Sequence, residues 1–190
     1  MRRKIGAIFI ALGAVLVSAA LALFIYNRIE DRAAGETADA VLNELEELIG
    51  TVGDDDPYDT GMETVTVDDH DYIGYLTIPS LGLTLPVMSD WDYKNLKIAP
   101  CRYSGSVKTG NLVICAHNYS THFGNIKTLS AGDEVYFTEM DGTVHIYTVA
   151  EVYILEPTAV EEMVESGYDL TLYTCTYGGQ TRVTVRCSEI

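Results

Sequence analysis

A cysteine and an arginine stand on either side of a short glycine turn near the C-terminal end of the sequence, in the stretch TLYTCTYGGQTR (171–182). The residues before the turn alternate like a strand that ends at Cys175, and Arg182 opens the strand after it. If the two strands pair, the guanidinium lies close to the sulfur, and nearby positive charge favours the thiolate, the reactive form of cysteine. A buried cysteine beside an exposed arginine is the alternative interpretation of the spacing alone.

The other three cysteines do not show this arrangement. Cys187 shares the apolar face of the last strand with Val183 and Val185, and Cys115 lies in the apolar run LVICA, so both are expected in the core. Cys101 lies between Pro100 and Arg102, and the sequence does not assign it to the core or to the surface. The sequence contains no CxxC pair and no zinc-ribbon spacing, so we predict no metal and no other cofactor. If Cys175 is a free nucleophile, at most one disulfide can form among the remaining three.

A thiol nucleophile that transfers an acyl group needs a proton donor for the leaving amine, and histidine is the usual one. His117 ends the apolar stretch NLVICAH (111–117) and leads into a polar segment, as a residue at the mouth of a barrel would. His122, five residues further along, is the second candidate. His70 lies in an acidic segment and His145 inside a strand, so solvated or packed roles suit them better.

The elements that must position these residues are mostly strands. The run 111–117 is apolar on both faces and is expected to be central, whereas Pro86 favours an edge or a bend. Seven or eight short strands with little helix predict a mainly β fold that forms a closed or nearly closed barrel. Strands are expected at 72–78, 81–88, 111–117, 133–138, 143–155, 171–176 and 182–187, and short helical turns near 91–98, 123–129 and 159–165.

The N-terminal segment predicts a membrane anchor. Met1-Arg-Arg-Lys4 precedes an apolar run that stays uncharged from residue 5 to Arg28. A helix of this length crosses a hydrocarbon core of about 30 Å. The positive-inside rule places the basic cluster in the cytoplasm and the rest of the chain outside. A cleaved signal peptide is the alternative, but the apolar run is long for one.

The net charge of −16 is unevenly distributed, and between Glu30 and Asp69 the only basic residue is Arg32. This balance excludes nucleic acid as a partner, because no basic stripe is present to neutralise phosphates. We expect a solvated acidic spacer, with a helix over 37–49 that ends at Gly50 and a linker beyond it. The predicted organisation is a cytoplasmic basic cluster with a transmembrane signal anchor (1–28), an acidic juxtamembrane helix and linker (29–70), and a catalytic β-barrel domain (71–190).

Taken together, these residues resemble those of the sortases, membrane-anchored cysteine transpeptidases of Gram-positive bacteria. Residues 171–175 (TLYTC) match the TLxTC motif of that family, and Arg182 matches the arginine on its following strand. Both motifs stand behind an N-terminal anchor, and the resemblance extends from about residue 72 to the end. The opening strands and the histidine segment of the family match at 73–79, 85–87 and 116–118.

The resemblance implies an eight-stranded β-barrel behind a single transmembrane helix at the cell membrane, with the catalytic domain outside. It implies that Cys175 attacks the threonine carbonyl of a C-terminal LPxTG-like sorting signal on secreted proteins and forms a thioester. His117 would protonate the leaving amine, and Arg182 would bind the substrate and stabilise the oxyanion, with Thr174 and Asn118 in support. An amine of a peptidoglycan precursor or a pilin lysine would then resolve the thioester. Arg186, on the same strand face as Arg182, is the alternative arginine.

The subclass stays open, because the chain resembles two classes of the family. The histidine segment and residues 99–106 resemble class B, whereas residues 175–178 resemble the pilus-building class C. Asp56-Pro57-Tyr58 matches the lid motif of class C, although an ordinary turn in an acidic tether explains it as well. Two other functions remain as alternatives. One is a membrane-anchored cysteine protease that hydrolyses its substrate, and the other is a non-catalytic barrel that binds cell-wall components.

Overall fold

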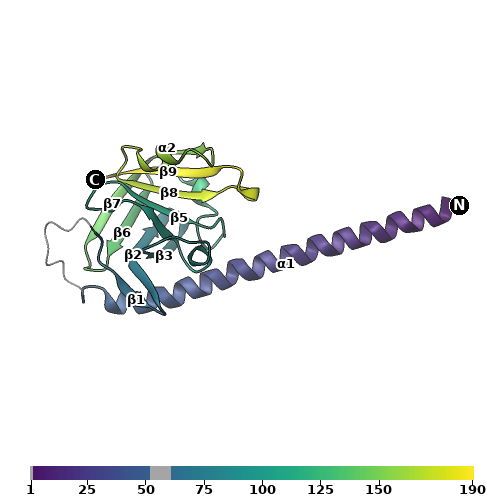
Figure 1. Ribbon diagram of the computed structural model, residues 1–190, viewed down its shortest axis with the longest axis horizontal. Helices are drawn as coiled ribbons and strands as arrows, with labels where there is room; N and C mark the ends of the chain where they lie inside the picture. The colour runs from purple at the N-terminus through teal and green to yellow at the C-terminus, as the bar shows by residue number, and fades with distance from the viewer. Residues whose placement is uncertain (1, 52–60) are drawn as a thin grey trace. The chain divides into compact units, whose positions relative to one another are not determined.

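The computed structural model describes residues 2–51 and 61–190 of the chain (Figure 1). Helix α1 (Arg2–Leu48) opens the chain, and its most apolar window has a mean hydropathy of 2.8, so by length and composition this helix could span a membrane. The contacts group Met1–Ala33 as one compact unit and Ala34–Ile190 as another. The three-part division made from the sequence stays a prediction.

Helix α1 does not break where the sequence indicated that a second helix would begin. Residues 28–36 are rich in alanine, arginine and glutamate, which propagate a helix well, and only Gly35 costs about 1 kcal/mol relative to alanine. The predicted helix over 37–49 is therefore the last part of α1. It ends as expected before Gly50, whose φ of 73° is left-handed.

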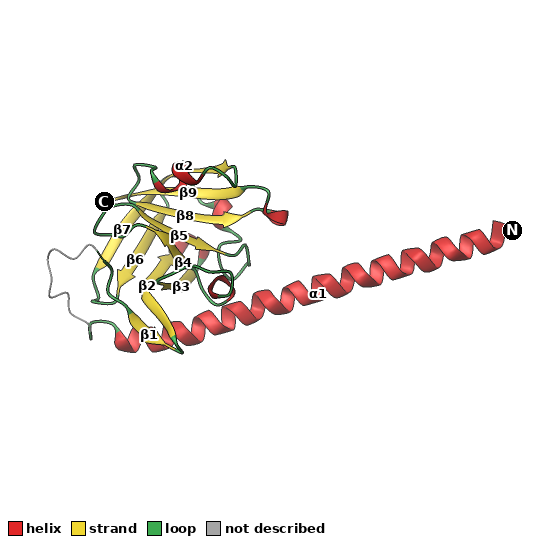
Figure 2. Cartoon of the chain, in the orientation of Figure 1, coloured by secondary structure: helices red, strands yellow, loops and turns green. Residues whose placement is uncertain are grey.

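Nine strands follow in the part of the chain that the structure describes, joined by turns and by short helices (Figure 2). The strands are β1 (Val65–Val67), β2 (His70–Ile78), β3 (Leu83–Met88), β4 (Cys101–Ser104), β5 (Leu112–Ala116), β6 (Glu134–Glu139), β7 (Val144–Leu155), β8 (Leu170–Cys175) and β9 (Arg182–Glu189). The short helices are η1 (Pro79–Leu81), η2 (Asn95–Lys97), η3 (Ile126–Thr128), α2 (Val160–Val164) and η4 (Tyr177–Gly179).

The strands form one sheet that closes on itself. Their order is β1-β2-β3-β4-β5-β8-β9-β7-β6, and β6 also pairs with β2, so β2 to β9 make a closed eight-stranded barrel. This confirms the predicted fold class. Neighbouring strands are antiparallel except β3–β4, which share one bridge, and β5–β8, which are parallel over five residue pairs. The parallel pair is possible because β6 and β7 form the crossover between its strands.

Two strands were not predicted, and both are short. Strand β1 lies inside the expected linker and pairs with β2 through a turn in which Asp68 and Asp69 have φ values of 48° and 62°. Strand β4 mixes cysteine, arginine, tyrosine and serine and shows no apolar alternation. Pro86, expected at an edge or a bend, lies within β3 opposite Tyr75 of β2, and on its other side β3 pairs with β4 only at Met88.

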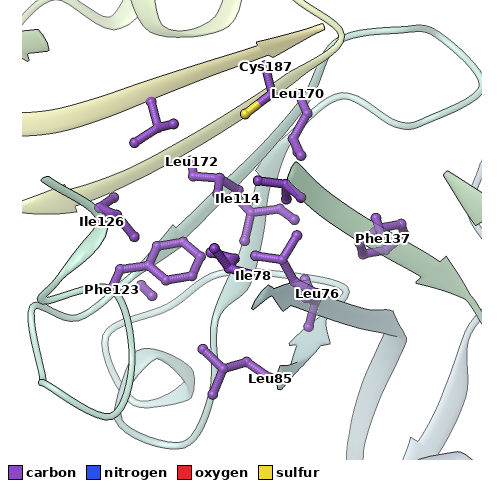
Figure 3. Packing of buried hydrophobic residues seen from close by; sticks show 14 of the residues in the cluster. Leu76, Ile78, Leu85, Ile114, Phe123, Ile126, Phe137, Leu170, Leu172 and Cys187 are labelled. Carbon is purple, nitrogen blue, oxygen red and sulfur yellow. The ribbon is translucent and has the colours of Figure 1, made fainter. Parts of the chain in front are cut away.

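The main core fills the barrel interior (Figure 3). Leu76, Ile114 and Leu172 come from three different strands, and each is at most 1% exposed. Burial of one such side chain contributes about 1.5–3 kcal/mol, so these strands are held mainly by their shared apolar face. Cys187 is also fully buried in this cluster, which confirms its prediction as a core cysteine.

A second cluster joins the last part of α1 to the outer face of the barrel. Val41 and Leu45, four residues apart on one helix face, are buried together with Tyr72, Cys101 and barrel residues around them. The backbone amide of Gly50 then donates to the carbonyl of Met140 at 2.9 Å, which ties the end of this helix to the β6–β7 turn. Residues 34–48 of α1, which include most of the predicted juxtamembrane helix, therefore pack against the barrel.

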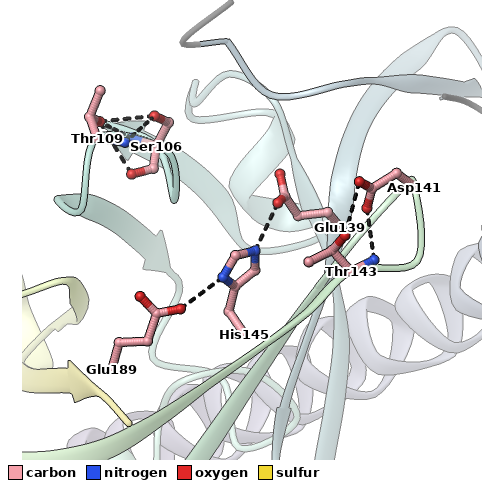
Figure 4. Close-up of polar contacts among 7 residues, drawn as sticks. All are labelled: Ser106, Thr109, Glu139, Asp141, Thr143, His145 and Glu189. Carbon is pink, nitrogen blue, oxygen red and sulfur yellow. Dashed lines mark hydrogen bonds and ion pairs between the residues drawn. The ribbon is translucent and has the colours of Figure 1, made fainter. Parts of the chain in front are cut away.

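An ionic network joins the β6–β7 hairpin to the C-terminal strand (Figure 4). Nε2 of His145 lies 2.8 Å from Oε1 of Glu139, and its Nδ1 lies 2.9 Å from Oε1 of Glu189. Since a neutral imidazole has only one N–H, satisfying both carboxylates requires the imidazolium. Burial alone would lower the pKa of His145, but its hydrogen bonds to the two carboxylates outweigh this and raise the pKa. Burial raises the pKa of Glu139, and the contact with His145 opposes that rise.

Replacing Leu45 with alanine is expected to lower the free energy of unfolding by about 2–5 kcal/mol, because the change opens a cavity in the second cluster. Denaturant unfolding followed by fluorescence measures the change. The exposed neighbour Glu46, replaced with alanine, is the matched control and should stay within about 0.5 kcal/mol of the parent protein. Equal unfolding midpoints for both variants would show that α1 does not stabilise the barrel.

The His145 network predicts a stability that depends on pH. A raised pKa in the folded state means that the contribution is complete below the ordinary histidine value of 6.5 and is lost as the pH rises through the raised value. The difference in unfolding free energy between the parent protein and His145→Gln should therefore be largest at about pH 6 and shrink towards about pH 9. Urea titrations at a series of pH values measure it. A difference that does not change with pH would contradict the imidazolium assignment.

Candidate active site

The three residues predicted to carry chemistry end three adjacent strands. Strand β8 lies between β5 and β9, and its last residue, Cys175, pairs directly with Arg182 at the start of β9. On the other side Ala116 pairs with Thr174, so His117, the next residue after β5, follows at the level of Cys175. Because neighbouring strands lie about 4.8 Å apart, this register brings the three residues together at one end of the barrel wall.

Alternation along β8 and β9 directs these side chains outward. Leu170 and Leu172 belong to the core cluster inside the barrel, whereas Tyr173 packs in clusters on the outer face. Cys175 is two residues beyond Tyr173 and shares its face. Arg182 lies on the same outer side, since its neighbour Val183 is buried in the inner cluster. The site is therefore a groove on the barrel surface and not its interior.

A cavity of about 170 Å³ lies at this position, and His117, Cys175 and Arg182 all line it. Cys175 and Arg182 are half-buried, as is His117. The three residues predicted from the sequence therefore line one cavity, although His117 comes from a part of the chain distant from the hairpin of Cys175 and Arg182. The other lining residues were not singled out as site residues from the sequence: Trp91, Tyr93, Leu96, Tyr103, Cys115, Ala116, Glu156, Pro157, Ala159, Val160, Met163 and Tyr173.

Aromatic rings form one wall of the cavity. The ring centroids of Trp91 and Tyr103 are 5.6 Å apart, and those of Tyr103 and Tyr173 are 5.4 Å apart in an edge-to-face arrangement. Tyr93 contacts Trp91 at 5.8 Å and is 76% exposed, so the wall continues to the surface. One sequence feature could have indicated this wall: the single tryptophan of the chain is followed two residues later by a tyrosine in a polar loop. Exposed aromatic pairs of this kind are typical of binding surfaces.

The loop after β5 holds His117 through its own backbone and rings. The carbonyl of His117 accepts a hydrogen bond from the amide of Phe123 at 3.1 Å, and the Tyr119 ring lies 4.9 Å from the imidazole. His122, the second candidate, is fully buried and is not among the described residues that line the cavity. The structure therefore places His117, and not His122, on the cavity that Cys175 lines.

Helix α1 approaches the same loop. A Cβ atom at Gly35 would lie 2.8 Å from Cγ2 of Thr121, closer than side chains tolerate, so glycine permits this approach. Ala34 and Ala38 on either side are also buried, at 4% and 1% exposure. Small residues thus let the helix pack close to the loop that carries His117.

Thr174 has a clear structural contact. Its buried hydroxyl donates to the carbonyl of Ala116 at 2.8 Å, which links the strand ends that precede Cys175 and His117. Among the described residues that line the cavity, neither Thr174 nor Asn118 is found. Their predicted support of substrate or oxyanion stays a prediction.

The turn between β8 and β9 places the guanidinium of Arg182. Its Nη1 donates to the carbonyls of Gly179 and Thr181, at 3.0 and 3.1 Å. Thr176 and Thr181 close the turn, because the amide of Thr176 donates to the carbonyl of Thr181 at 3.0 Å and their hydroxyls lie 2.9 Å apart. Arg186, the alternative arginine, is fully buried and does not line the cavity in the described part of the chain.

The four cysteines are free thiols in different environments. Cys101 and Cys115 face each other across β4 and β5, and burial raises the pKa of Cys115 to about 12 and that of Cys101 further. Burial also raises the pKa of Cys187 to about 12. These three thiols are therefore held in the unreactive protonated form, whereas Cys175 is only half-buried and borders the cavity.

Asp56, Pro57 and Tyr58, the candidate lid, lie outside the described residues. Within residues 2–51 and 61–190, no group of three or more histidine, cysteine, aspartate and glutamate side chains is arranged to hold a metal ion.

Comparison with known proteins points to one family. The family model described as Sortase domain matches residues 76–190. Sortase A of Bacillus anthracis is 30% identical over 127 residues, which cover 64% of this chain and 60% of that protein, so the chain spans only part of its relative's length.

Solved structures share the fold. Sortase C1 from Streptococcus suis is 28% identical, with a TM-score of 0.56 over 64% of this chain and 74% of that chain. The sortase D5 transpeptidase of Clostridium perfringens has a TM-score of 0.63, over 82% of this chain and 99% of that chain, at 18% identity. At that identity the second comparison concerns the fold alone.

In the folded protein, iodoacetamide is expected to alkylate Cys175 and to leave Cys101, Cys115 and Cys187 unmodified, because only the half-buried thiol is accessible. Peptide mapping by mass spectrometry identifies the modified residue. Cys175→Ala should take up no label until denaturant is added, after which the other thiols should react. Modification of Cys115 at a rate similar to that of Cys175 would contradict this description of the cavity.

Proposed function

The chain belongs to the sortase family, and on that premise we propose that it is a cysteine transpeptidase that cleaves an LPxTG-like sorting signal after its threonine. The observation that carries the proposal is the meeting of Cys175, His117 and Arg182 on one cavity at the ends of β8, β5 and β9. A non-catalytic barrel would not need a half-buried thiol, a histidine and an arginine there.

In the first half of the reaction the sulfur of Cys175, as thiolate, attacks the threonine carbonyl carbon. Arg182 donates hydrogen bonds to the oxygen as it becomes negatively charged, which lowers the barrier most when the donor is positioned beforehand. The carbon–nitrogen bond then breaks, and His117, as imidazolium, gives its proton to the leaving amine. The products are a thioester on Cys175, a neutral imidazole and the released C-terminal peptide.

In the second half an amine attacks the thioester carbon. The neutral His117 takes the proton that the amine loses, and the carbon–sulfur bond breaks as the new amide forms. The sulfur leaves as the thiolate, so the thiolate–imidazolium pair is regenerated. The acceptor class proposed is an amine of a peptidoglycan precursor or a pilin lysine, and the substrates are secreted proteins with sorting signals.

The N-terminal half of α1 supports a location at the membrane. Its apolar window is exposed along its whole length, and residues 1–4 carry the basic cluster. We propose that this helix crosses the membrane once, with the basic cluster in the cytoplasm and the barrel on the outer side. This topology would place the site on the same side as the secreted substrates and the amine acceptors proposed for it.

The proposal predicts an acyl-enzyme. Incubation with threonine-containing sorting peptides should add the mass of the cleaved peptide to Cys175, and Cys175→Ala should form no adduct. His117→Ala should lower kcat by about 10²–10⁴-fold, the usual contribution of a positioned proton donor. Arg182→Lys, which keeps the charge but loses the fork of donors, should lower it by about 10²–10³-fold. Intact-protein mass spectrometry and peptide-release kinetics measure both effects.

Added amines distinguish transfer from hydrolysis. A transpeptidase should shift its products from free acid to amide as the amine concentration rises, while a cysteine protease should continue to release acid. Absence of an adduct with every peptide of a threonine-containing library would remove the proposal. Binding of cell-wall components by Cys175→Ala at the parent level, without any adduct in the parent protein, would instead support the non-catalytic barrel.

A further inference from the structure

Arg186 is a buried charge that the mechanism does not use. It lies in the middle of β9, four residues after Arg182, and its side chain is fully buried. Removing a guanidinium from water costs several kcal/mol unless its N–H groups donate to acceptors, so a buried arginine needs acceptors close to it.

The guanidinium of Arg186 is surrounded by hydrogen-bond acceptors. Its Nε donates to the hydroxyl of Tyr153 on β7 at 2.8 Å, and Nη1 donates to the hydroxyl of Thr171 on β8 at 2.6 Å. Nη1 also donates to the carbonyl of Met163 at 3.0 Å, and Nη2 donates to the carbonyl of Glu162. The side chain of Arg186 therefore connects β7 and β8, the two strands that flank β9, with a segment outside the sheet.

That segment is helix α2, and it forms a wall of the cavity. Glu162 and Met163 lie in its last turn, where carbonyls lack partners within the helix. With only five residues, α2 has too few internal hydrogen bonds to be stable alone, so its place depends on what holds it. Met163 lines the cavity, as do Ala159 and Val160 before it.

We propose that Arg186 is a positioning residue that holds the α2 wall at the distance from Cys175 at which the sorting peptide binds. Its fork spans acceptors in three directions, which the single ammonium group of lysine does not reproduce. Because the wall contacts the substrate and not the reacting atoms, loss of the anchor should weaken binding and leave the chemical step intact. The inference rests on the proposed function, since it assigns the cavity to the sorting peptide.

Three variants test it in the full chain. Arg186→Lys keeps the charge and removes the fork, Tyr153→Phe removes one acceptor, and Lys127→Met removes an exposed cation of η3 as a control. For Arg186→Lys we expect KM to rise about tenfold while kcat changes by no more than about twofold, the pattern of lost ground-state binding. Tyr153→Phe should shift KM in the same direction by a smaller factor. The control should match the parent protein.

Hydrogen exchange supplies a readout that does not need substrate. The amides of Met163 and Glu165 donate to the carbonyls of Ala159 and Glu161 at 3.1 and 2.8 Å, so they report whether the wall is formed. They should exchange faster in Arg186→Lys, while the amides of β8 and the alkylation rate of Cys175 stay at the parent values. If Arg186→Lys does not fold, Tyr153→Phe decides the question by the same two measurements.

The outcomes separate the two proposals. A parent protein that cleaves no sorting peptide removes the proposed function, and faster α2 exchange in the variant would then still support the anchor. Unchanged KM and unchanged exchange would overturn the inference. A fall in kcat together with slower alkylation of Cys175 would overturn it as well, because Arg186 would then act on the nucleophile.

Discussion

The pairing of β8 with β5 on one side and β9 on the other is the constraint on which the candidate site depends. Successive side chains of a strand point to opposite faces, so a slip of one residue in either register would turn Cys175 into the barrel or separate it from Arg182. The buried side chains of Leu172 and Ile114 oppose such a slip, since it would expose them. The hydroxyl of Thr174 adds a directional bond to Ala116 at the end where the register matters most.

The motif TLYTC places two threonine hydroxyls with structural hydrogen bonds in front of Cys175. Thr171 accepts a hydrogen bond from the buried Arg186, and Thr174 donates one to the carbonyl of Ala116. The Thr171 hydroxyl is an acceptor for the buried guanidinium, and the Thr174 hydroxyl is a donor to the buried Ala116 carbonyl. Loss of either hydroxyl would remove a hydrogen bond from a buried polar group and lower the stability of the fold. The spacing of the two threonines before the cysteine is thus explained by contacts with the neighbouring strands and with α2.

Helix α1 has two parts with different surroundings. Its exposed apolar part has the composition of a membrane span, while Val41 and Leu45 near its end are buried in the second cluster of the barrel unit. Gly35 lowers the intrinsic stability of the helix but permits close packing against the loop that follows His117. The last part of α1 therefore packs on the barrel and on the loop after His117 and is not a simple spacer.

Alternation and turn residues predicted most of the strands, a closed or nearly closed barrel, the core position of Cys187 and the candidates Cys175, Arg182 and His117, because these depend on local periodicity and on side-chain chemistry. The sequence did not indicate β1 or β4, which are too short to show a period, or the continuity of α1, because helix propensity in 28–36 outweighed the expected start at Thr37. The cavity walls were decided only by the tertiary structure. Trp91, Tyr103 and Met163 come from separate segments, and their contact depends on barrel closure and on where Arg186 holds α2, which no local pattern encodes.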